Sequence, residues 1–400
     1  MLYAGTRRPV RVNHRAPKHP CRNNSGEETH RPVSLSLHNG AHPPFWPVRA
    51  FRCGRMRGMK RASFRLSVLL AALGWTLSTL AADSLRMVFI DVEGGQATLI
   101  VAPNGESLLV DAGWPGFEGR DAERIARAAQ SLGLHQIDYM LVTHYHLDHV
   151  GGVPPLLERI PLRRFIDHGD NTETGERAEQ LAEPYYELRA KADHMVVKPG
   201  DQIRLGPVTL EIVAARGEVL SRPLAGAGQA NPRCREVPHQ PDDPTENAKS
   251  IGFRLSFGKF RFLDLADLTW NLEQRLACPE NKLGTVDVYL VTHHGSALSN
   301  NPALVHAVQP RVAIMNNGAR KGGDAAAWQV VRTSPGLEDL WQLHYALKAG
   351  EAANVPESFI ANPEAECKGY NIRLEAWPEG RFTVTNERNQ FSKTYAPRTR

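Results

Sequence analysis

Short apolar runs separated by polar turns dominate the chain after residue 83. Runs of about four to eight apolar or β-branched residues, bounded by Gly, Asn, Asp or Pro, are typical of strands. Asn104-Gly105, which separates two such runs, predicts a tight hairpin turn. The pattern predicts strands at residues 85–92, 97–102, 107–112, 139–143, 164–167, 208–214, 251–257, 260–265 and 312–315.

A helical pattern interrupts these strands at residues 122–132. Ile125, Ala128 and Ala129 recur there at the spacing of one helix face. Residues 220–246 are rich in Pro, Gly and Asp, so we expect a long loop. Strands that alternate with helices and hairpins predict a mixed α/β domain built in layers.

Two segments of the chain repeat one pattern. DYMLVTH at residues 138–144 and DVYLVTH at 287–293 are both Asp-led apolar strands that end in Leu-Val-Thr-His. The repeat indicates two related halves, each delivering a histidine from the end of a strand to a common site. Chance similarity between apolar strands is the alternative interpretation.

The segment after the first of these strands reads HYHLDH, at residues 144–149. Three imidazoles and a carboxylate within one tight turn are suited to Zn²⁺, Mn²⁺ or Fe. His144 and His146 can face one ion while Asp148 and His149 face a second. A solvated polar turn is the other interpretation, and the density of ligand-type side chains favours metal binding.

At this point the sequence resembles the metallo-β-lactamase superfamily, whose hallmark is HxHxDH. More narrowly, it resembles the soluble domain of the ComEC DNA-uptake channel family. The segments that carry the narrower resemblance are FIDVEGGQATLI at 89–100, LVDAG at 109–113, NAKS at 247–250, LADL at 265–268 and HHGS at 293–296. The resemblance covers about residues 85–320 and implies a four-layer αββα sandwich that binds two divalent metal ions and catalyses hydrolysis.

Carried over by position, the resemblance implies a set of metal ligands, namely His144, His146, Asp148, His149, Asp267 and His293. The first two would hold metal 1, the next two metal 2, and Asp267 would bridge both ions. His293 would complete metal 2, with His294 as the fallback. Asp148 and His294 are the candidate catalytic residues, His294 as a possible proton donor to the leaving group.

The chain departs from the broader superfamily at metal 1. Most hydrolases of this fold carry a further histidine there, but the corresponding segment, residues 210–217, has none. Asn247 or Ser250 falls near that position. The other candidates are histidines that are otherwise expected at the surface or in the core, namely His168, His194 and His239.

Two smaller features concern the surroundings of the ligands. Asp111 either orients a ligand histidine or is simply a turn residue at a strand end. Ala266 stands where a glycine usually precedes the bridging aspartate, a change that we expect the fold to tolerate.

The N-terminal 82 residues differ in charge from the rest of the chain. They contain 14 Lys and Arg but 2 Asp and Glu, whereas residues 83–400 hold 34 basic and 41 acidic residues. Residues 59–82 have the basic start, short apolar stretch and small terminal residues of a signal peptide, with a membrane anchor as the alternative. Residues 1–58 are expected to be a misassigned extension or a disordered tail. We therefore expect a periplasmic or secreted protein without a stable membrane span.

Three cysteines remain in the body, Cys234, Cys278 and Cys367. Their spacing fits neither a disulfide framework nor a cysteine metal site. One bridge and one free thiol are expected in an oxidising compartment, and the sequence does not select the pair.

These features predict an exported metal-dependent hydrolase, with a metal-activated hydroxide and zinc as the expected metal. We expect a hydrolase domain at residues 83–320 and a continuation of it, without a matching motif, at 321–400. Phosphodiesters are the favoured substrates, and Arg320-Lys321 either contacts the anion or is a solvated turn. The acidic balance of the body does not support nucleic acid as the partner. The alternatives are hydrolysis of a lactam, lactone or thioester, and a metal-binding domain with little catalysis.

Overall fold

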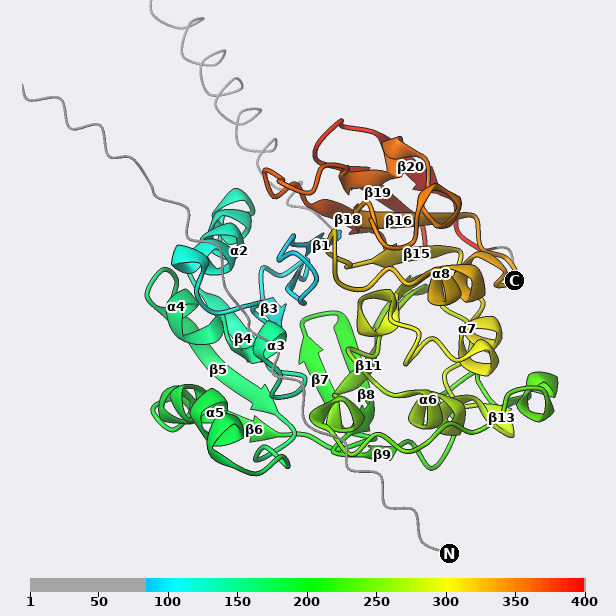
Figure 1. The fold of residues 1–400 in the computed structure, drawn as a ribbon, viewed down its shortest axis with the longest axis horizontal. Helices are drawn as coiled ribbons and strands as arrows, with labels where there is room; N and C mark the ends of the chain where they lie inside the picture. Colours follow the sequence, from blue (N-terminus) through cyan, green and yellow to red (C-terminus); the bar gives the residue numbers. More distant parts are fainter. Residues whose placement is uncertain (1–83, 399–400) are drawn as a thin grey trace, which may run out of the picture. The chain divides into compact units, whose positions relative to one another are not determined.

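The computed structural model describes residues 84–398, so the predicted extension at 1–58 and signal peptide at 59–82 lie outside the described residues. Two large sheets form the centre of the domain (Figure 1). The first has the order β20-β19-β18-β1-β2-β3-β4-β5-β6, and the second has the order β17-β16-β15-β14-β12-β11-β8-β7, with β9 paired to β8.

The strands of the first sheet are β1 (Leu85–Phe89), β2 (Thr98–Val101), β3 (Ser107–Val110), β4 (Ile137–Leu141), β5 (Leu162–Asp167), β6 (Asp193–Val196), β18 (Ile372–Ala376), β19 (Phe382–Asn386) and β20 (Ser392–Tyr395). Those of the second are β7 (Gln202–Leu205), β8 (Val208–Ala215), β9 (Glu218–Val219), β11 (Gly252–Phe257), β12 (Phe260–Asp264), β14 (Val288–Leu290), β15 (Val312–Met315), β16 (Asp339–His344) and β17 (Ile360–Asn362). A separate pair joins β10 (Gln229–Ala230) to β13 (Glu280–Asn281).

Helices cover the outer face of each sheet (Figure 1). The α-helices are α2 (Arg120–Ser131), α3 (Leu147–Val150), α4 (Val153–Leu157), α5 (Glu176–Arg189), α6 (Trp270–Ala277), α7 (Pro302–Val308) and α8 (Ala325–Arg332). Short 3₁₀ turns are η1 (Phe117–Gly119), η2 (Pro232–Arg235), η3 (Glu246–Lys249), η4 (Thr292–Gly295), η5 (Glu351–Ala353) and η6 (Glu357–Phe359).

Three apolar layers hold the domain together. Phe89 and Phe262 belong to the layer between the two sheets, with their ring centroids 5.9 Å apart. Ile125 of α2 packs in the layer outside the first sheet, and Leu304 of α7 packs outside the second. Burial of one such side chain contributes about 1.5–3 kcal/mol, before entropy is counted. The layers run helix, sheet, sheet, helix, which confirms the predicted αββα fold class.

The predicted strands are present, with ends that shift by a few residues. The loop predicted at residues 220–246 also contains β10 and η2, and a disulfide between Cys234 and Cys278 ties it to the end of α6. Residues 321–400, for which the sequence offered no motif, supply α8 and β16–β20. Strand β16 pairs with β15 and β18 pairs with β1, so this segment extends both sheets.

The repeated pattern maps onto equivalent places in the two sheets. Strand β4 runs parallel to β3, and β14 runs parallel to β12. His144 follows β4 and His293 follows β14, so each sheet supplies one histidine-bearing turn. None of the helices within residues 84–398 is long and apolar enough to cross a membrane.

Candidate metal centre

The first histidine-bearing turn leads from β4 into α3 and is held against the neighbouring loops by close backbone contacts. A Cβ atom on Gly95 would lie 2.4 Å from the carbonyl oxygen of Asp148. A Cβ on Gly152 would lie 1.9 Å from the carbonyl oxygen of Ala112. Both positions therefore require glycine for close approach and not for backbone conformation.

Asp111 orients the histidines of this turn. Its Oδ2 lies 2.7 Å from Nδ1 of His149, and Thr143 donates its backbone N–H and its hydroxyl to the same carboxylate. Because the Thr143 hydroxyl donates to Asp111, it accepts from Nδ1 of His144, 3.1 Å away. This arrangement leaves a lone pair on Nε2 of His144, and an acidic partner on Nδ1 fixes the ring of His149 in the manner usual for metal ligands. Of the two interpretations of Asp111, the structure supports the orienting one.

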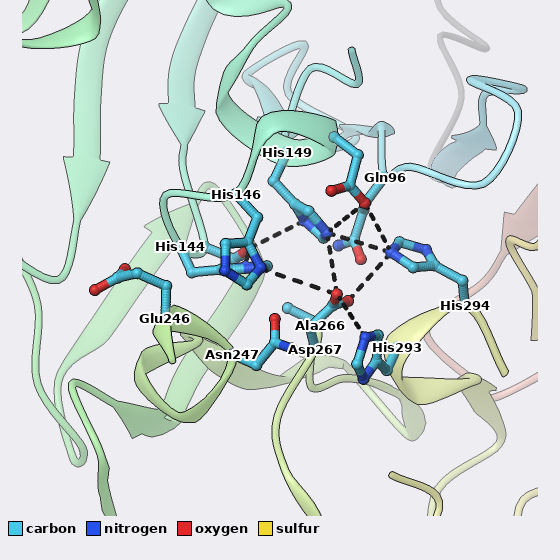
Figure 2. Close-up of polar contacts among 12 residues, drawn as sticks. Gln96, His144, His146, His149, Glu246, Asn247, Ala266, Asp267, His293 and His294 are labelled. Atoms are coloured by element: carbon cyan, nitrogen blue, oxygen red, sulfur yellow. Dashed lines mark hydrogen bonds and ion pairs between the residues drawn. The ribbon is translucent and has the colours of Figure 1, made fainter. Parts of the chain in front are cut away.

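The second turn, η4, places two consecutive histidines in the left-handed backbone region. His293 and His294 both have φ of 55°, and Ala266, just before Asp267, has φ of 48°. Such conformations cost about 1–2 kcal/mol per residue and concentrate at functional sites. They turn the two rings toward different sides of the Asp267 carboxylate (Figure 2).

One side of this carboxylate forms a compact cluster with Asp148, His149 and His294, whose ligand atoms all lie within 4.8 Å of one another. Nε2 of His294 lies 3.2 Å from Asp148 Oδ2 and 3.3 Å from Asp267 Oδ1. Nε2 of His149 lies 3.3 Å from Asp267 Oδ2. The compact cluster thus contains His294, the fallback ligand, and the assignment of His293 to metal 2 stays a prediction.

His144 and His293 lie outside this compact cluster but also face Asp267. Their Nε2 atoms lie 4.0 and 3.4 Å from Asp267 Oδ2, the oxygen that His149 also faces. Ser299 donates its hydroxyl to the carbonyl of Leu268, so it accepts from Nδ1 of His293, 3.3 Å away. His293 thus presents an Nε2 lone pair to the carboxylate, as His144 does.

His146 lies at the rim of the site, where Nε2 is 3.3 Å from a carboxylate oxygen of Glu173. The Nζ atom of Lys321 pairs with Asp148 and also donates to the carbonyl of Gly94 at 2.8 Å. Sequence reasoning treated Lys321 as a turn residue or an anion contact and did not find Glu173. Glu173 precedes α5 without a motif, so no sequence signal marks it.

The other candidate histidines have partners of their own. Buried His168 lies 2.9 Å from Glu246, and His194 lies 2.8 Å from Asp167. His239 is exposed in the long loop. Asn247 in η3 has a buried Oδ1 that has no hydrogen-bond partner among residues 84–398.

Burial and mutual charge set the protonation of the cluster. Burial and the nearby charge of His149 hold the pKa of His144 well below its ordinary value, so the ring is neutral. Burial alone would lower the pKa of His149, but Asp267, Asp148 and Asp111 raise it well above its ordinary value. Burial likewise opposes ionisation of Asp267, yet the surrounding histidines hold its pKa well below the usual range. The cluster is therefore built around ionised carboxylates.

The donor set fits a pair of divalent ions. Nε2 of His144 is buried and, within the described part of the chain, has no hydrogen-bond partner. A neutral imidazole with a buried lone pair beside a buried carboxylate leaves a binding requirement that a cation satisfies. Imidazole nitrogens and carboxylate oxygens are ligands that Zn²⁺ accepts, and the mixture also suits Mn²⁺ or Fe.

A family profile and several curated proteins match parts of this chain. The profile of the metallo-beta-lactamase superfamily matches residues 90–232. Ribonuclease Z from Bradyrhizobium sp. (strain ORS 278) is 33% identical over 124 residues, which are 30% of this chain and 39% of that protein. Hydroxyacylglutathione hydrolase from Xylella fastidiosa (strain M12) is 39% identical over 64 residues, which are 16% of this chain and 20% of that protein. The matched region thus spans well under half of either relative.

Comparison with solved structures also finds similar chains, at low sequence identity and with TM-scores below 0.5. The metallo-beta-lactamase fold protein YhfI from Bacillus subtilis is 12% identical with a TM-score of 0.41, over 65% of this chain and 96% of that chain. The family match and the four-layer architecture support placement in the metallo-β-lactamase superfamily. This fold implies a dinuclear metal site, for which the cluster around Asp267 is the candidate.

Proposed function

We propose that the protein is an exported metal-dependent hydrolase that cleaves phosphodiester bonds at the centre around Asp267. The observation that carries this proposal is the carboxylate of Asp267, both of whose oxygens lie 3.3–3.4 Å from histidine nitrogens. A bridging carboxylate between two ligand sets is the arrangement required to hold two cations a few ångströms apart.

The ligand sets follow from the grouping of side chains around Asp267, where Asp148, His149 and His294 form the compact cluster and the other histidines lie outside it. His144 and His293, with His146 turned inward from Glu173, would hold one ion. The second ion would be held by Asp148, His149 and His294. In this assignment His293 replaces the histidine that residues 210–217 lack, so the absence of that histidine does not separate phosphodiesterases from thioester hydrolases.

When bound, the metal pair supplies a water of lowered pKa and stabilises negative charge on the attacked centre. The chain's own residues position these parts. Asp111 and Thr143 hold the tautomers of His149 and His144, and Ser299 does the same for His293. Lys321 places a cation beside Asp148, where it can attract an anionic substrate. His294 points into the carboxylates, a position that suits a ligand better than the predicted proton donor.

Two lines of support favour phosphodiesters. Ribonuclease Z is the name of the relative that matches over the longer region. The motif set at residues 85–320 that resembles the ComEC family indicates the same class of bond. Thioester hydrolysis is the second candidate, because the matched relative from Xylella is a hydroxyacylglutathione hydrolase.

Export is supported by the disulfide between Cys234 and Cys278, whose Cα atoms are 5.6 Å apart. Such bonds form and persist in oxidising compartments. Together with the expected signal peptide at 59–82, this bond favours a periplasmic or secreted location.

The test is hydrolysis of bis(4-nitrophenyl) phosphate by the purified protein loaded with Zn²⁺ or Mn²⁺, beside a thioester and a β-lactam substrate. We expect turnover of the phosphodiester that is lost in His146→Ala and kept in His135→Ala, a matched control at an exposed position. Turnover of the thioester or lactam alone would replace the proposed substrate class. No turnover of any of the three would favour a metal-binding domain without catalysis.

A further inference from the structure

A recess of about 1040 Å³ opens directly beside the metal centre, and His146 and Asp148 form part of its wall. The loop after β3 supplies Trp114 and Pro115, and α5 supplies Leu181 and Pro184. Its volume lies at the upper end of the range for drug-sized ligands. A substrate whose reacting group sits at the metal centre therefore has space for a large substituent.

The walls of this recess are mainly apolar. Leu147 lies between the candidate ligands His146 and Asp148, and its side chain is 38% exposed. Trp114 and Leu181 are only partly buried on the opposing walls. Large apolar side chains left exposed in a concave site gain free energy when an apolar group covers them.

The charges in the recess do not fit a polyanion. Arg177 is the cation on its wall, and Glu173 and Asp148 are the acids. Lys321 adds one further positive charge at the edge, with Nζ 5.0 Å from the centre of the Trp114 ring and paired to Asp148. A nucleic-acid strand needs a row of cations that tracks successive phosphates, whereas this site offers enough charge for one phosphoryl group.

We propose that the recess binds a bulky apolar organic group, aryl or acyl, that is esterified to the phosphoryl group at the metal centre. The substrate is then a phosphodiester with a single negative charge and one large apolar substituent, and not an oligonucleotide. This assignment rests on the proposed function for the phosphoryl group and adds the chemistry of the substituent esterified to it.

The experiment measures binding without turnover. Two non-hydrolysable monoanions, dimethylphosphinate and methyl(2-naphthyl)phosphinate, are titrated into the Zn²⁺-loaded protein by calorimetry. We expect the naphthyl compound to bind at least about tenfold more tightly, because it buries apolar surface against the recess. Equal affinities, or stronger binding of a 12-residue oligonucleotide than of the naphthyl compound, would overturn the assignment.

Two matched leucine variants on α5 test whether the naphthyl group binds in the recess. Leu181→Ala removes a wall side chain, and Leu188→Ala removes a partly buried leucine of the same helix that packs on the same core but does not line the recess. We expect the first to reduce the preference for the naphthyl compound about fivefold and the second to leave it unchanged. Equal effects of the two variants on the preference would contradict the assignment, and their melting temperatures separate a loss of folding from a loss of binding.

Binding and hydrolysis assays on the same protein distinguish failure of the proposed function from failure of the recess assignment. Tight, Leu181-dependent binding of the naphthyl compound without hydrolysis of any phosphodiester would overturn the proposed function and leave the apolar recess in place. Hydrolysis of phosphodiesters without preference for the naphthyl compound would support the proposed function and overturn the recess assignment.

Discussion

Two buried clusters within residues 84–398 combine ligand-type side chains, but they differ in their need for a metal ion. The first is the metal centre around Asp267. The second, which we name the Arg124 cluster, comprises Asp91, Arg124, His344 and Cys367. Its histidine, carboxylate and thiol also lie within 4.8 Å of one another. Residue type and proximity therefore do not separate the two.

The difference is the source of positive charge. In the Arg124 cluster, Nη1 of Arg124 lies 3.0 Å from Asp91 Oδ2, and Nη2 lies 3.3 Å from Glu93. His344 adds a contact of 2.7 Å to the same aspartate. A buried guanidinium thus occupies the place that a metal ion would take.

In the described part of the chain, the metal centre has no buried guanidinium, and the positive charge beside its carboxylates comes from titratable histidines such as His149, whose pKa is raised. Within residues 84–398, the side chains that face Asp267 at ion-pair distance are histidines, and Lys321 reaches only Asp148 from a position that is 38% exposed. Two buried carboxylates that are compensated only by histidines can exchange the protons of those histidines for cations from solution. The comparison teaches that the lack of a permanent internal cation, and not the list of ligand residues, distinguishes the candidate metal site.

The largest expected effect comes from replacing the central aspartate of the metal centre by asparagine, compared with the same replacement in the Arg124 cluster. Asp267→Asn removes the charge between the two ligand sets, and we expect phosphodiester hydrolysis to fall by about 1,000-fold or more. Asp91→Asn should leave the metal content unchanged and alter the activity far less. Steady-state kinetics with metal analysis checks both, and an equal loss in the two variants would contradict the distinction.

Replacing Arg124, the internal cation of the Arg124 cluster, should lower the free energy of unfolding and leave metal binding unchanged. Arg124→Met leaves Asp91 buried beside one histidine, and we expect the free energy of unfolding to fall by about 3 kcal/mol. Chemical denaturation measures the change, with exposed Arg127 on the same helix as the control position in Arg127→Met. A loss of bound metal at unchanged stability would reverse the roles assigned to the two clusters.

The third prediction separates the two histidines of η4. In His293→Gln, one of the two ions should bind about a hundredfold more weakly while the other keeps its affinity. In His294→Gln the same loss should fall on the other ion. Stepwise titration with Co²⁺, read by its absorption spectrum, resolves the two binding events. If His293→Gln leaves both affinities unchanged, His293 lies outside the ligand set.

The smallest effect concerns the thiol of the Arg124 cluster. Burial, followed by the charge of Asp91, raises the pKa of Cys367 to about 12. Because a raised pKa keeps the thiol protonated, alkylation at pH 8 should be about a hundredfold slower than for a free cysteine. The rate should continue to rise with pH above 9, where an ordinary thiol reaches its plateau. Iodoacetamide labelling followed by mass spectrometry measures it, and rapid labelling at pH 8 would show that the thiolate is stabilised.

Much of the fold and part of the candidate site can be predicted from local patterns in the sequence. The strands, a mixed α/β domain and the HYHLDH turn follow from spacing along the chain, whereas the αββα fold class and Asp267 follow from a family resemblance. The different positions of His293 and His294 around Asp267 do not follow from the sequence, because they depend on two consecutive residues with φ of 55°. The Arg124 cluster was also missed, since Asp91 and His344 are 253 positions apart and neither stands in a metal-binding motif.

Pairing and packing between segments far apart in the sequence explain why the remaining features could not be predicted. Strand β18 pairs with β1 across nearly the whole described chain, although Ile372, Leu374 and Ala376 alternate with polar residues as a half-buried strand requires. Glu173 and the apolar recess arise where α5 meets the first histidine-bearing turn. Contacts of this kind are set by tertiary packing and leave no local signal in the sequence.

The most direct measurement is the number of Zn²⁺ ions bound per chain at equilibrium, by dialysis and elemental analysis, in the unmodified protein, Asp267→Asn and Asp91→Asn. We expect two ions in the unmodified protein and in Asp91→Asn, and at most one weakly held ion in Asp267→Asn. Two ions retained in Asp267→Asn, or an ion lost from Asp91→Asn alone, would show that the metal centre lies elsewhere.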